Sequence, residues 1–227
     1  MKTYIVVGGS KGIGNAIVQS LLENNKVVNL SRSKPDYTHA NLTHHDCDIL
    51  SDELPEIEHA DGLVYCPGSI NLKPIKRLSL EDFRADYEIN VIGAVKAIQQ
   101  YLAILKNGND PSIVLFSTVA AKLGMPFHAS IAAAKSGVEG LVKSLGAELA
   151  TTLRINAIAP TVTNTELASK LLRNDKMIEN ITERHPMKKI LEPQDVAGMA
   201  EFLLSEKAGS ISGQVFEMDY GIVSFKI

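Results

Sequence analysis

The chain has 227 residues and a formal net charge of -3, with 45% hydrophobic and 22% charged residues. This length favours one domain and leaves no room for a full-sized second domain that binds substrate. A nucleic-acid-binding function is disfavoured, because such proteins need a basic excess to neutralise phosphates. The composition is typical of a folded protein with a sizeable core, not of a disordered or fibrous chain.

The two cysteines, Cys47 and Cys66, could form at most one disulfide, and their spacing indicates neither a metal site nor a disulfide framework. We therefore expect no metal and a reducing, cytoplasmic compartment. The apolar run from Tyr4 to Val7 is interrupted by Gly8 and Gly9 before it reaches the length of a signal peptide. No stretch is long enough to span a membrane, so we expect no membrane association.

Short runs rich in Val, Ile and Leu alternate along the chain with longer amphipathic segments, which is typical of a parallel sheet covered by helices. The expected strands are Thr3–Val7, Lys26–Leu30, Asn41–Cys47, Gly62–Cys66, Ser112–Ser117, Arg154–Ile158 and Gln214–Met218. The expected helices are Ile13–Glu23, Leu80–Leu105, Ser130–Leu149, Thr165–Leu172 and Pro193–Leu204. The predicted fold class is α/β, a single Rossmann-type doubly wound parallel sheet over residues 1–227 with helices on both faces.

A glycine-rich turn joins the first expected strand to the first expected helix. Glycines there let the backbone turn tightly and let a pyrophosphate approach the amide groups at the start of the helix. Alternatively, the glycines serve only packing. The spacing Gly8-x-x-x-Gly12-x-Gly14 resembles the short-chain dehydrogenase/reductase family. The resemblance implies a nicotinamide dinucleotide held by Gly8, Ser10, Lys11, Gly12, Ile13 and Gly14.

The residues after the second expected strand indicate which dinucleotide is bound. An acidic residue there would bind the ribose 2′-hydroxyl of NAD, whereas a cation suits the 2′-phosphate of NADP. This chain has Ser31, Arg32 and Ser33, and the resemblance places Lys11 where a basic residue often holds the same phosphate. We therefore expect NADP(H) in preference to NAD(H). The alternative is that both cations lie on solvated turns.

The resemblance covers essentially the whole chain. It implies that Asp48 and Ile49 contact the adenine. Val7 stands where the family has a threonine that hydrogen-bonds to an asparagine, and Cys66 replaces that asparagine, so the loss of both partners leaves no orphan polar group. The further cofactor-binding residues implied by the family are Cys66, Pro67, Gly68, Lys135, Pro160, Val162 and Thr165.

The family reduces carbonyls with a serine, a tyrosine and a lysine, supported by a helical asparagine. The run Ala132 to Gly137 resembles the segment around the family lysine, here Lys135, and the tyrosine is expected four residues earlier. That residue is Ile131, whose aliphatic side chain can neither donate a proton nor hydrogen-bond to a substrate. The register is supported by Thr118, thirteen residues before Ile131, and by Asn90, twenty-eight before Thr118, which match the serine and the asparagine.

The implied catalytic residues are therefore Asn90, Thr118 and Lys135. The hydroxyl of Thr118 could polarise a carbonyl, with Ser117 as a less suitable substitute. His128 lies three residues before Ile131 and titrates near neutral pH, so it is one candidate for a replacement acid. A water molecule held by Lys135 and Asn90 is another, and the sequence does not decide between them.

The segment from Asn164 to Ile190 matches the variable substrate lid of the family. Its apolar residues could line a substrate site or serve only helix packing. The segment Asp219-Tyr220-Gly221 resembles a turn that lies at a subunit interface in the family, which implies a homotetramer or homodimer. The apolar lid residues are Leu167, Leu171, Leu172, Met177 and Ile181.

Two functions remain open. The first is an NADP(H)-dependent oxidoreductase that acts on a small carbonyl or alcohol substrate by an altered proton-transfer route. The second is a catalytically silent NADP(H)-binding protein with a sensing, regulatory or scaffolding role. The retention of Asn90, Thr118 and Lys135 favours the enzyme, and the loss of the tyrosine favours the silent protein.

Overall fold

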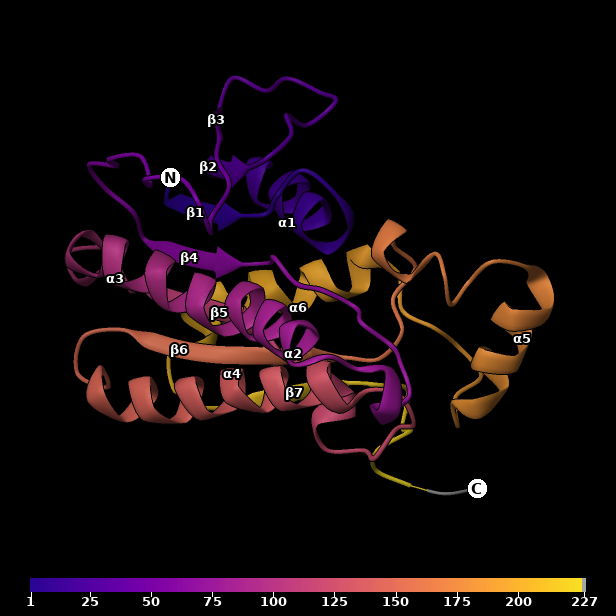
Figure 1. Ribbon diagram of the computed structural model, residues 1–227. Helices are drawn as coiled ribbons and strands as arrows, with labels where there is room; N and C mark the ends of the chain where they lie inside the picture. Colours follow the sequence, from indigo (N-terminus) through magenta and orange to yellow (C-terminus); the bar gives the residue numbers. More distant parts are fainter. Residues whose placement is uncertain (226–227) are drawn as a thin grey trace.

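The computed structural model describes residues 1–225, which form one seven-stranded parallel sheet flanked by helices (Figure 1). Its strand order is β3-β2-β1-β4-β5-β6-β7, which confirms the predicted doubly wound α/β fold. The strands are β1 (Thr3–Val7), β2 (Lys26–Ser31), β3 (Leu42–Asp46), β4 (Gly62–Tyr65), β5 (Ser112–Phe116), β6 (Arg154–Pro160) and β7 (Val215–Met218). The α-helices are α1 (Gly12–Leu22), α2 (Leu80–Tyr87), α3 (Gly93–Lys106), α4 (Ala129–Glu148), α5 (Asp175–Arg184) and α6 (Pro193–Leu204).

Both faces of the central strands are buried, which explains why these strands are apolar without interruption. In β1, Ile5 and Val7 face the core cluster that contains α3 and α4 side chains. Their neighbours Tyr4 and Val6 face the second cluster, which contains α1 and α6 side chains. Because successive side chains of a strand point to opposite faces, one apolar run supports two helical layers.

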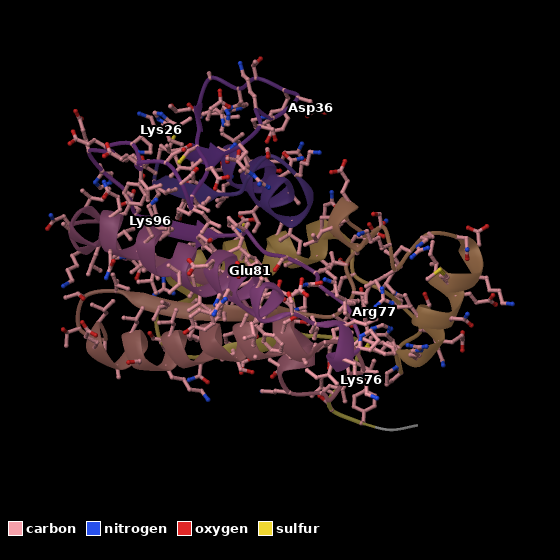
Figure 2. The ribbon with its side chains drawn as sticks, viewed as in Figure 1. Lys26, Asp36, Lys76, Arg77, Glu81 and Lys96 are labelled. Atoms are coloured by element: carbon pink, nitrogen blue, oxygen red, sulfur yellow. The ribbon has the colours of Figure 1, made fainter. Side chains whose placement is uncertain are left out.

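Charged side chains mark the outer surface. Lys26, Asp36, Lys76, Arg77 and Glu81 are exposed and point away from the ribbon (Figure 2). Their position is that expected for groups whose burial without a partner would be costly.

The predicted helix over residues 80–105 is interrupted. Ser79 caps α2 with a capping box, and α2 is separated from α3 by a π-helical segment, Glu88–Ile92. Asn90 lies in that segment. Its side-chain amide donates to the carbonyl oxygen of Asp86 at 2.7 Å, which is one reason the backbone ladder changes there.

The prediction of a helix over Thr165–Leu172 is wrong. Only a 3-10 turn, Glu166–Ala168, forms there, because the hydroxyl of Thr165 caps Ala168 N at 3.3 Å and closes a single turn. The helix of this region is instead α5, which begins after Asn174 and was not predicted. The side chain of Asn174 accepts from Met177 N at 3.0 Å, an N-cap that sequence reasoning could have used.

The sheet topology determines where a ligand can bind. The chain runs outward from β1 through β2 to β3 on one side, and from β4 to β7 on the other. The strand order therefore reverses between β1 and β4. In open α/β sheets the crevice at the carboxyl ends of such strands is the usual ligand site. Gly8 and Cys66 follow these two strands directly.

Candidate active site

The glycine turn after β1 has a shape that only glycine permits at two positions. Gly8 has φ of +78°, in the left-handed region. A Cβ atom on Gly14 would overlap the carbonyl oxygen of Gly8. Helix α1 begins here without a side-chain cap, since Lys11 occupies the N-cap position and makes no capping hydrogen bond. The first amide groups of α1 are therefore free to bind an anion.

A cavity of about 710 Å³, here called the outer cavity, opens beside this turn. Its volume lies within the usual range for small-molecule sites. At its edge the hydroxyls of Ser10 and Ser33 are 3.1 Å apart, and Arg32 Nη1 lies 4.0 Å from Asp48 Oδ2. The predicted cofactor-binding residues that line the outer cavity are Gly8, Ser10, Lys11, Ser31, Arg32, Ser33, Asp48, Ile49, Cys66, Pro67 and Gly68.

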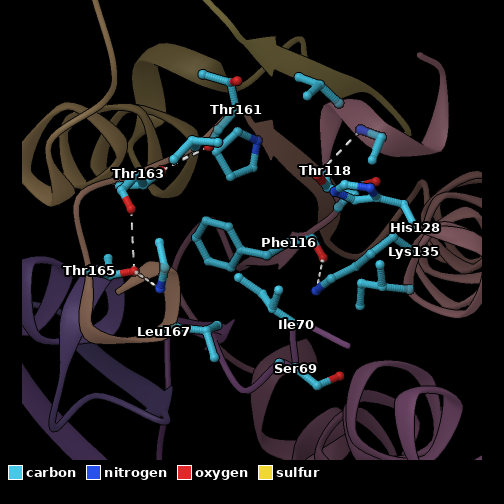
Figure 3. Close-up of a pocket in the computed structure, with 18 of the residues that line it drawn as sticks. Ser69, Ile70, Phe116, Thr118, His128, Lys135, Thr161, Thr163, Thr165 and Leu167 are labelled. Carbon is cyan, nitrogen blue, oxygen red and sulfur yellow. Dashed lines mark hydrogen bonds between the residues drawn. The ribbon is translucent and has the colours of Figure 1, made fainter. Parts of the chain in front are cut away.

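A second cavity of about 180 Å³, here called the inner cavity, lies at the carboxyl ends of β4, β5 and β6 (Figure 3). It shares Cys66, Gly68, Ser69 and Leu167 with the outer cavity, so the two cavities meet. The predicted site residues that line it are Ile13, Cys66, Gly68, Thr118, His128, Lys135, Pro160, Val162 and Thr165. Gly12, Gly14 and Asn90 line neither cavity and lie behind the walls.

Lys135 projects from α4 to the place where the two cavities meet. Its Nζ donates a hydrogen bond to the carbonyl oxygen of Phe116 at 2.8 Å, drawn as a dashed line in Figure 3. Burial lowers the pKa of Lys135 to about 8, because the charged form loses its hydration. Burial also raises the pKa of the nearby Cys66 thiol to about 12, so that side chain is a neutral wall residue at physiological pH.

Asn90 is the centre of a hydrogen-bonded group whose other members, Ser69 and Asp86, line the outer cavity. Its Nδ2 donates to the hydroxyl of Ser69 at 3.0 Å, and that hydroxyl donates to Asp86 Oδ1 at 2.6 Å. Asn90 Oδ1 and Asp86 Oδ2 are buried without a hydrogen-bond partner in residues 1–225. The carboxylate of Asp86 raises the pKa of Lys135, which partly opposes the effect of burial.

Sequence reasoning missed Ser69 and Asp86. A local signal existed for each, since Ser69 follows the Cys66-Pro67-Gly68 segment and Asp86 lies one helical turn before Asn90. Neither spacing, however, indicates that the two side chains meet. Seventeen residues separate them, and only the packing of α2 against the loop after β4 brings them together.

The tyrosine position is filled by a buried hydrocarbon side chain. Ile131 is 5% exposed and lines the inner cavity. None of the six tyrosines, all within the described residues, lines either cavity. Thr118 and His128 also face the inner cavity, and Figure 3 shows both near Lys135. Ser117 lines it too, but its hydroxyl donates to Glu139 Oε1 at 2.7 Å.

His128 is held by its own loop. Its Nδ1 lies 2.7 Å from the carbonyl oxygen of Pro126. Because a carbonyl only accepts, Nδ1 carries the proton, and Nε2 is a donor only in the imidazolium form.

Of the apolar residues predicted in the lid, the structure brings two to the site. Leu167 and Leu171 line the inner cavity, whereas Leu172, Met177 and Ile181 do not. The lid is also tied to the glycine turn, because Lys11 Nζ lies 2.8 Å from Glu166 Oε2.

Within residues 1–225, no three His, Cys, Asp or Glu side chains are grouped so that they could hold a metal ion. No helix in the described part of the chain is long and apolar enough to cross a membrane.

Comparison with known proteins identifies the family. Residues 45–223 match the family described as enoyl-(acyl carrier protein) reductase. The 2,5-dichloro-2,5-cyclohexadiene-1,4-diol dehydrogenase of Sphingobium indicum is 29% identical over 243 residues, covering 98% of this chain and 97% of that protein. This chain belongs to the short-chain dehydrogenase/reductase family.

Solved structures agree with this assignment. The ligand-free aldohexose dehydrogenase of Thermoplasma acidophilum is 28% identical, with a TM-score of 0.89 over 99% of this chain and 95% of that chain. ElxO with NADP bound is 25% identical, with a TM-score of 0.88 over 99% of this chain and all 100% of the other. The likeness to these structures extends over the whole sheet and both helical layers.

Proposed function

We propose that the protein is an NADP(H)-dependent oxidoreductase that interconverts an alcohol and a carbonyl compound without a tyrosine acid. The observation that carries this proposal is the junction of the two cavities at Cys66, Gly68 and Ser69, with the Lys135 ammonium beside it. A dinucleotide bound along the outer cavity would extend its nicotinamide end into the inner cavity. The residues fit such a cofactor, because Gly8 and Gly14 permit the tight turn before α1, and the first amide groups of this helix have no side-chain cap and can bind a pyrophosphate.

The preference for NADP(H) is supported by the groups at the far end of the outer cavity. Ser10 and Ser33 present two hydroxyls there, and Arg32 and Lys11 supply two cations. A 2′-phosphate could accept from all four side chains, whereas a 2′-hydroxyl needs an acceptor. Asp48, a carboxylate that lines this cavity, lies 4.0 Å from Arg32 Nη1.

When bound, the cofactor supplies or accepts a hydride. In the oxidative direction the alcohol carbon loses a hydride to NADP⁺ and the alcohol oxygen loses a proton, which yields the carbonyl compound and NADPH. Thr118 would orient the substrate oxygen, and Lys135 would hold the proton at Nζ and exchange it with the substrate oxygen through a water molecule. With a pKa of about 8, Lys135 can take up or release a proton near neutral pH.

His128 is the second candidate for the proton donor. It lines the inner cavity and could donate from Nε2 as an imidazolium. Replacing His128 with Gln tests this route, since Gln retains a polar side chain but cannot carry the charge. We expect His128→Gln to retain most activity and Lys135→Met to lose it.

The buried Ile131 also favours a second function, a catalytically silent NADP(H)-binding protein. The test combines titration of the protein with NADPH and NADH and a turnover screen over carbonyl compounds, each repeated with Ile131→Tyr. Nucleotide binding with turnover in the unmodified protein supports the enzyme. Turnover seen only in Ile131→Tyr would support the silent protein, and no nucleotide binding would contradict both.

Two further expectations belong to the same proposal. The family resemblance implies a homodimer or homotetramer, and two cysteines without a disulfide framework favour a reducing, cytoplasmic compartment. The turn at Asp219, implied to lie at a subunit interface, is rigid in the structure, because both carboxylate oxygens accept backbone amides, from Gly221 and Val223, at 2.8 Å. Sedimentation equilibrium would contradict the expected assembly if the protein were monomeric at all concentrations.

A further inference from the structure

The walls of the inner cavity consist mainly of hydrocarbon. Apolar side chains come from the loop after β4, from β5, from α4 and from the lid, so no side of the cavity is polar throughout. Figure 3 shows Ile70, Phe116 and Leu167 around its centre. Further apolar lining residues are Leu72, Met125, Ile131 and Leu171.

The inner cavity contains no carboxylate and no guanidinium among its described lining residues. Its basic side chains are Lys135 and His128. The ammonium of Lys135 already donates to Phe116 and lies beside Gly68, where the two cavities meet and where a bound cofactor would cover it. A charged substrate group would therefore be buried without a fixed partner, which is costly.

Two of the six hydroxyl side chains that line the inner cavity already donate to carboxylates. Ser69 donates to Asp86, and Ser117 donates to Glu139. Their hydroxyl protons are therefore not available to a substrate.

The three threonines that follow β6, Thr161, Thr163 and Thr165, also donate within the protein. Thr163 donates to the carbonyl oxygen of Thr161 at 3.1 Å, and Thr165 to that of Thr163 at 3.4 Å. His185 Nδ1 lies 2.8 Å from a backbone carbonyl, so its Nε2 accepts from Thr161 at 2.7 Å. Within residues 1–225, Thr118 is the only lining residue whose hydroxyl donates to no protein acceptor, so its proton can be donated to a substrate.

The volume limits the size of a ligand. A cavity of about 150 Å³ lined by Leu, Ile and Phe holds one benzene molecule. The inner cavity has about 180 Å³ and would share part of that space with the nicotinamide ring near Pro160 and Val162. The space left inside the cavity therefore holds at most about one six-membered ring, and the remainder of any larger ligand would lie outside its open side.

We propose that the inner cavity binds a neutral alcohol, or the corresponding ketone, that carries one oxygen on a single six-membered ring or a chain of similar volume. This inference rests on the proposed function and narrows its substrate class. The oxygen contacts Thr118, and the ring packs against Ile131 and the lid leucines.

Three probes that share one ring test the inference: cyclohexanol, cyclohexane-1,2-diol and cyclohexanecarboxylate. Their binding to NADP⁺-saturated and to nucleotide-free protein is measured by ligand-observed NMR titration. We expect cyclohexanol to bind about tenfold more tightly than the diol, because the second hydroxyl loses its hydration and finds no second lining hydroxyl that can donate to it. The carboxylate should bind more weakly still. Equal or tighter binding of the diol or the carboxylate, or no binding of cyclohexanol, would overturn the inference.

A pair of lid variants tests whether the probes bind in the inner cavity. Leu171 lines the inner cavity and Leu172, its partly buried neighbour, does not. We expect Leu171→Arg to weaken cyclohexanol binding about tenfold and to strengthen carboxylate binding, since the new cation faces the ligand. Leu172→Arg should leave the order of the probes unchanged. Equal effects of the two substitutions would also overturn the inference.

The same samples separate this inference from the proposed function. NADPH binding is followed by its fluorescence in each. Loss of NADPH binding with the probe order as expected would refute the proposed function and leave the selectivity of the cavity standing. NADPH binding with a reversed probe order would refute the inference alone.

Discussion

Lys11 Nζ lies 2.8 Å from Glu166 Oε2, so a cation of the glycine turn is paired with the lid. Both side chains are largely exposed, and such a pair contributes about 0–1 kcal/mol. If Lys11 binds a 2′-phosphate, Glu166 competes with that phosphate. We therefore expect Glu166→Gln to tighten NADPH binding up to about fivefold and to leave NADH binding unchanged.

Two further variants show whether the effect on NADPH affinity is specific to the pair of Lys11 and Glu166. Lys11→Met should weaken NADPH binding about tenfold with a smaller effect on NADH. Glu183→Gln removes an exposed carboxylate that pairs with Lys188 in the lid, and serves as the control. Fluorescence titration measures each affinity, and an equal gain for NADH in Glu166→Gln would contradict the assignment of Lys11.

Gly→Ala substitutions should have opposite effects on stability at Gly14, in the glycine turn, and at Gly140, in α4. A Cβ atom at Gly14 meets the Gly8 carbonyl, whereas one at Gly140, on the exposed side of α4, meets nothing within 4 Å. We expect Gly14→Ala to weaken the binding of NADPH and of NADH by at least about tenfold and to destabilise the fold. Gly140→Ala should raise the free energy of unfolding by about 0.5–1 kcal/mol, as measured by urea denaturation. Normal nucleotide binding by Gly14→Ala would show that the turn adapts.

Asp86 should shift the pH dependence of carbonyl reduction, because its charge affects the pKa of Lys135. Removing its negative charge makes the ammonium less favourable, so Asp86→Asn lowers the pKa of Lys135 below about 8. The alkaline limb of the pH profile for carbonyl reduction should then move to lower pH. Glu81→Gln, an exposed change on the same helix, is the control. If Asp86→Asn lowers the rate equally at every pH and leaves the alkaline limb in place, the role of Asp86 is merely structural.

Lys135 should also make stability depend on pH. Its pKa is about 8 in the folded protein and 10.5 for an unperturbed lysine, so in the unfolded chain this side chain binds more protons between these values. The contribution of Lys135 to the free energy of unfolding therefore rises with pH across this window, by an amount on the order of 3 kcal/mol at most, whereas Cys66, whose pKa is raised to about 12, contributes a fall. Lys135→Met should remove this rise, whereas Lys143→Met, at an exposed position of α4, should retain it. If the free energy of unfolding depends on pH in the same way in both variants, the lowered pKa of Lys135 is contradicted.

Local patterns predicted much of the fold. The strands follow from short continuous apolar runs and most helices from an apolar period of about four residues, both of which are local properties of the chain. The glycine turn was predictable for the same reason, since its conformation depends on adjacent residues. The lid was not. Over Thr165–Leu172 the pattern suggests a helix, but the apolar side chains Leu167 and Leu171 line a cavity instead of packing together.

The sequence by itself determined the doubly wound sheet, the glycine turn, the positions of Asn90, Thr118 and Lys135, and the hydrocarbon at Ile131. The tertiary structure alone decided that Ser69 and Asp86 meet behind Lys135, that the pKa of this lysine is lowered, and that one lining hydroxyl remains free. The reason is physical. Strand and helix periods arise between neighbours in the chain, whereas desolvation and hydrogen-bond competition arise between segments that only packing brings into contact.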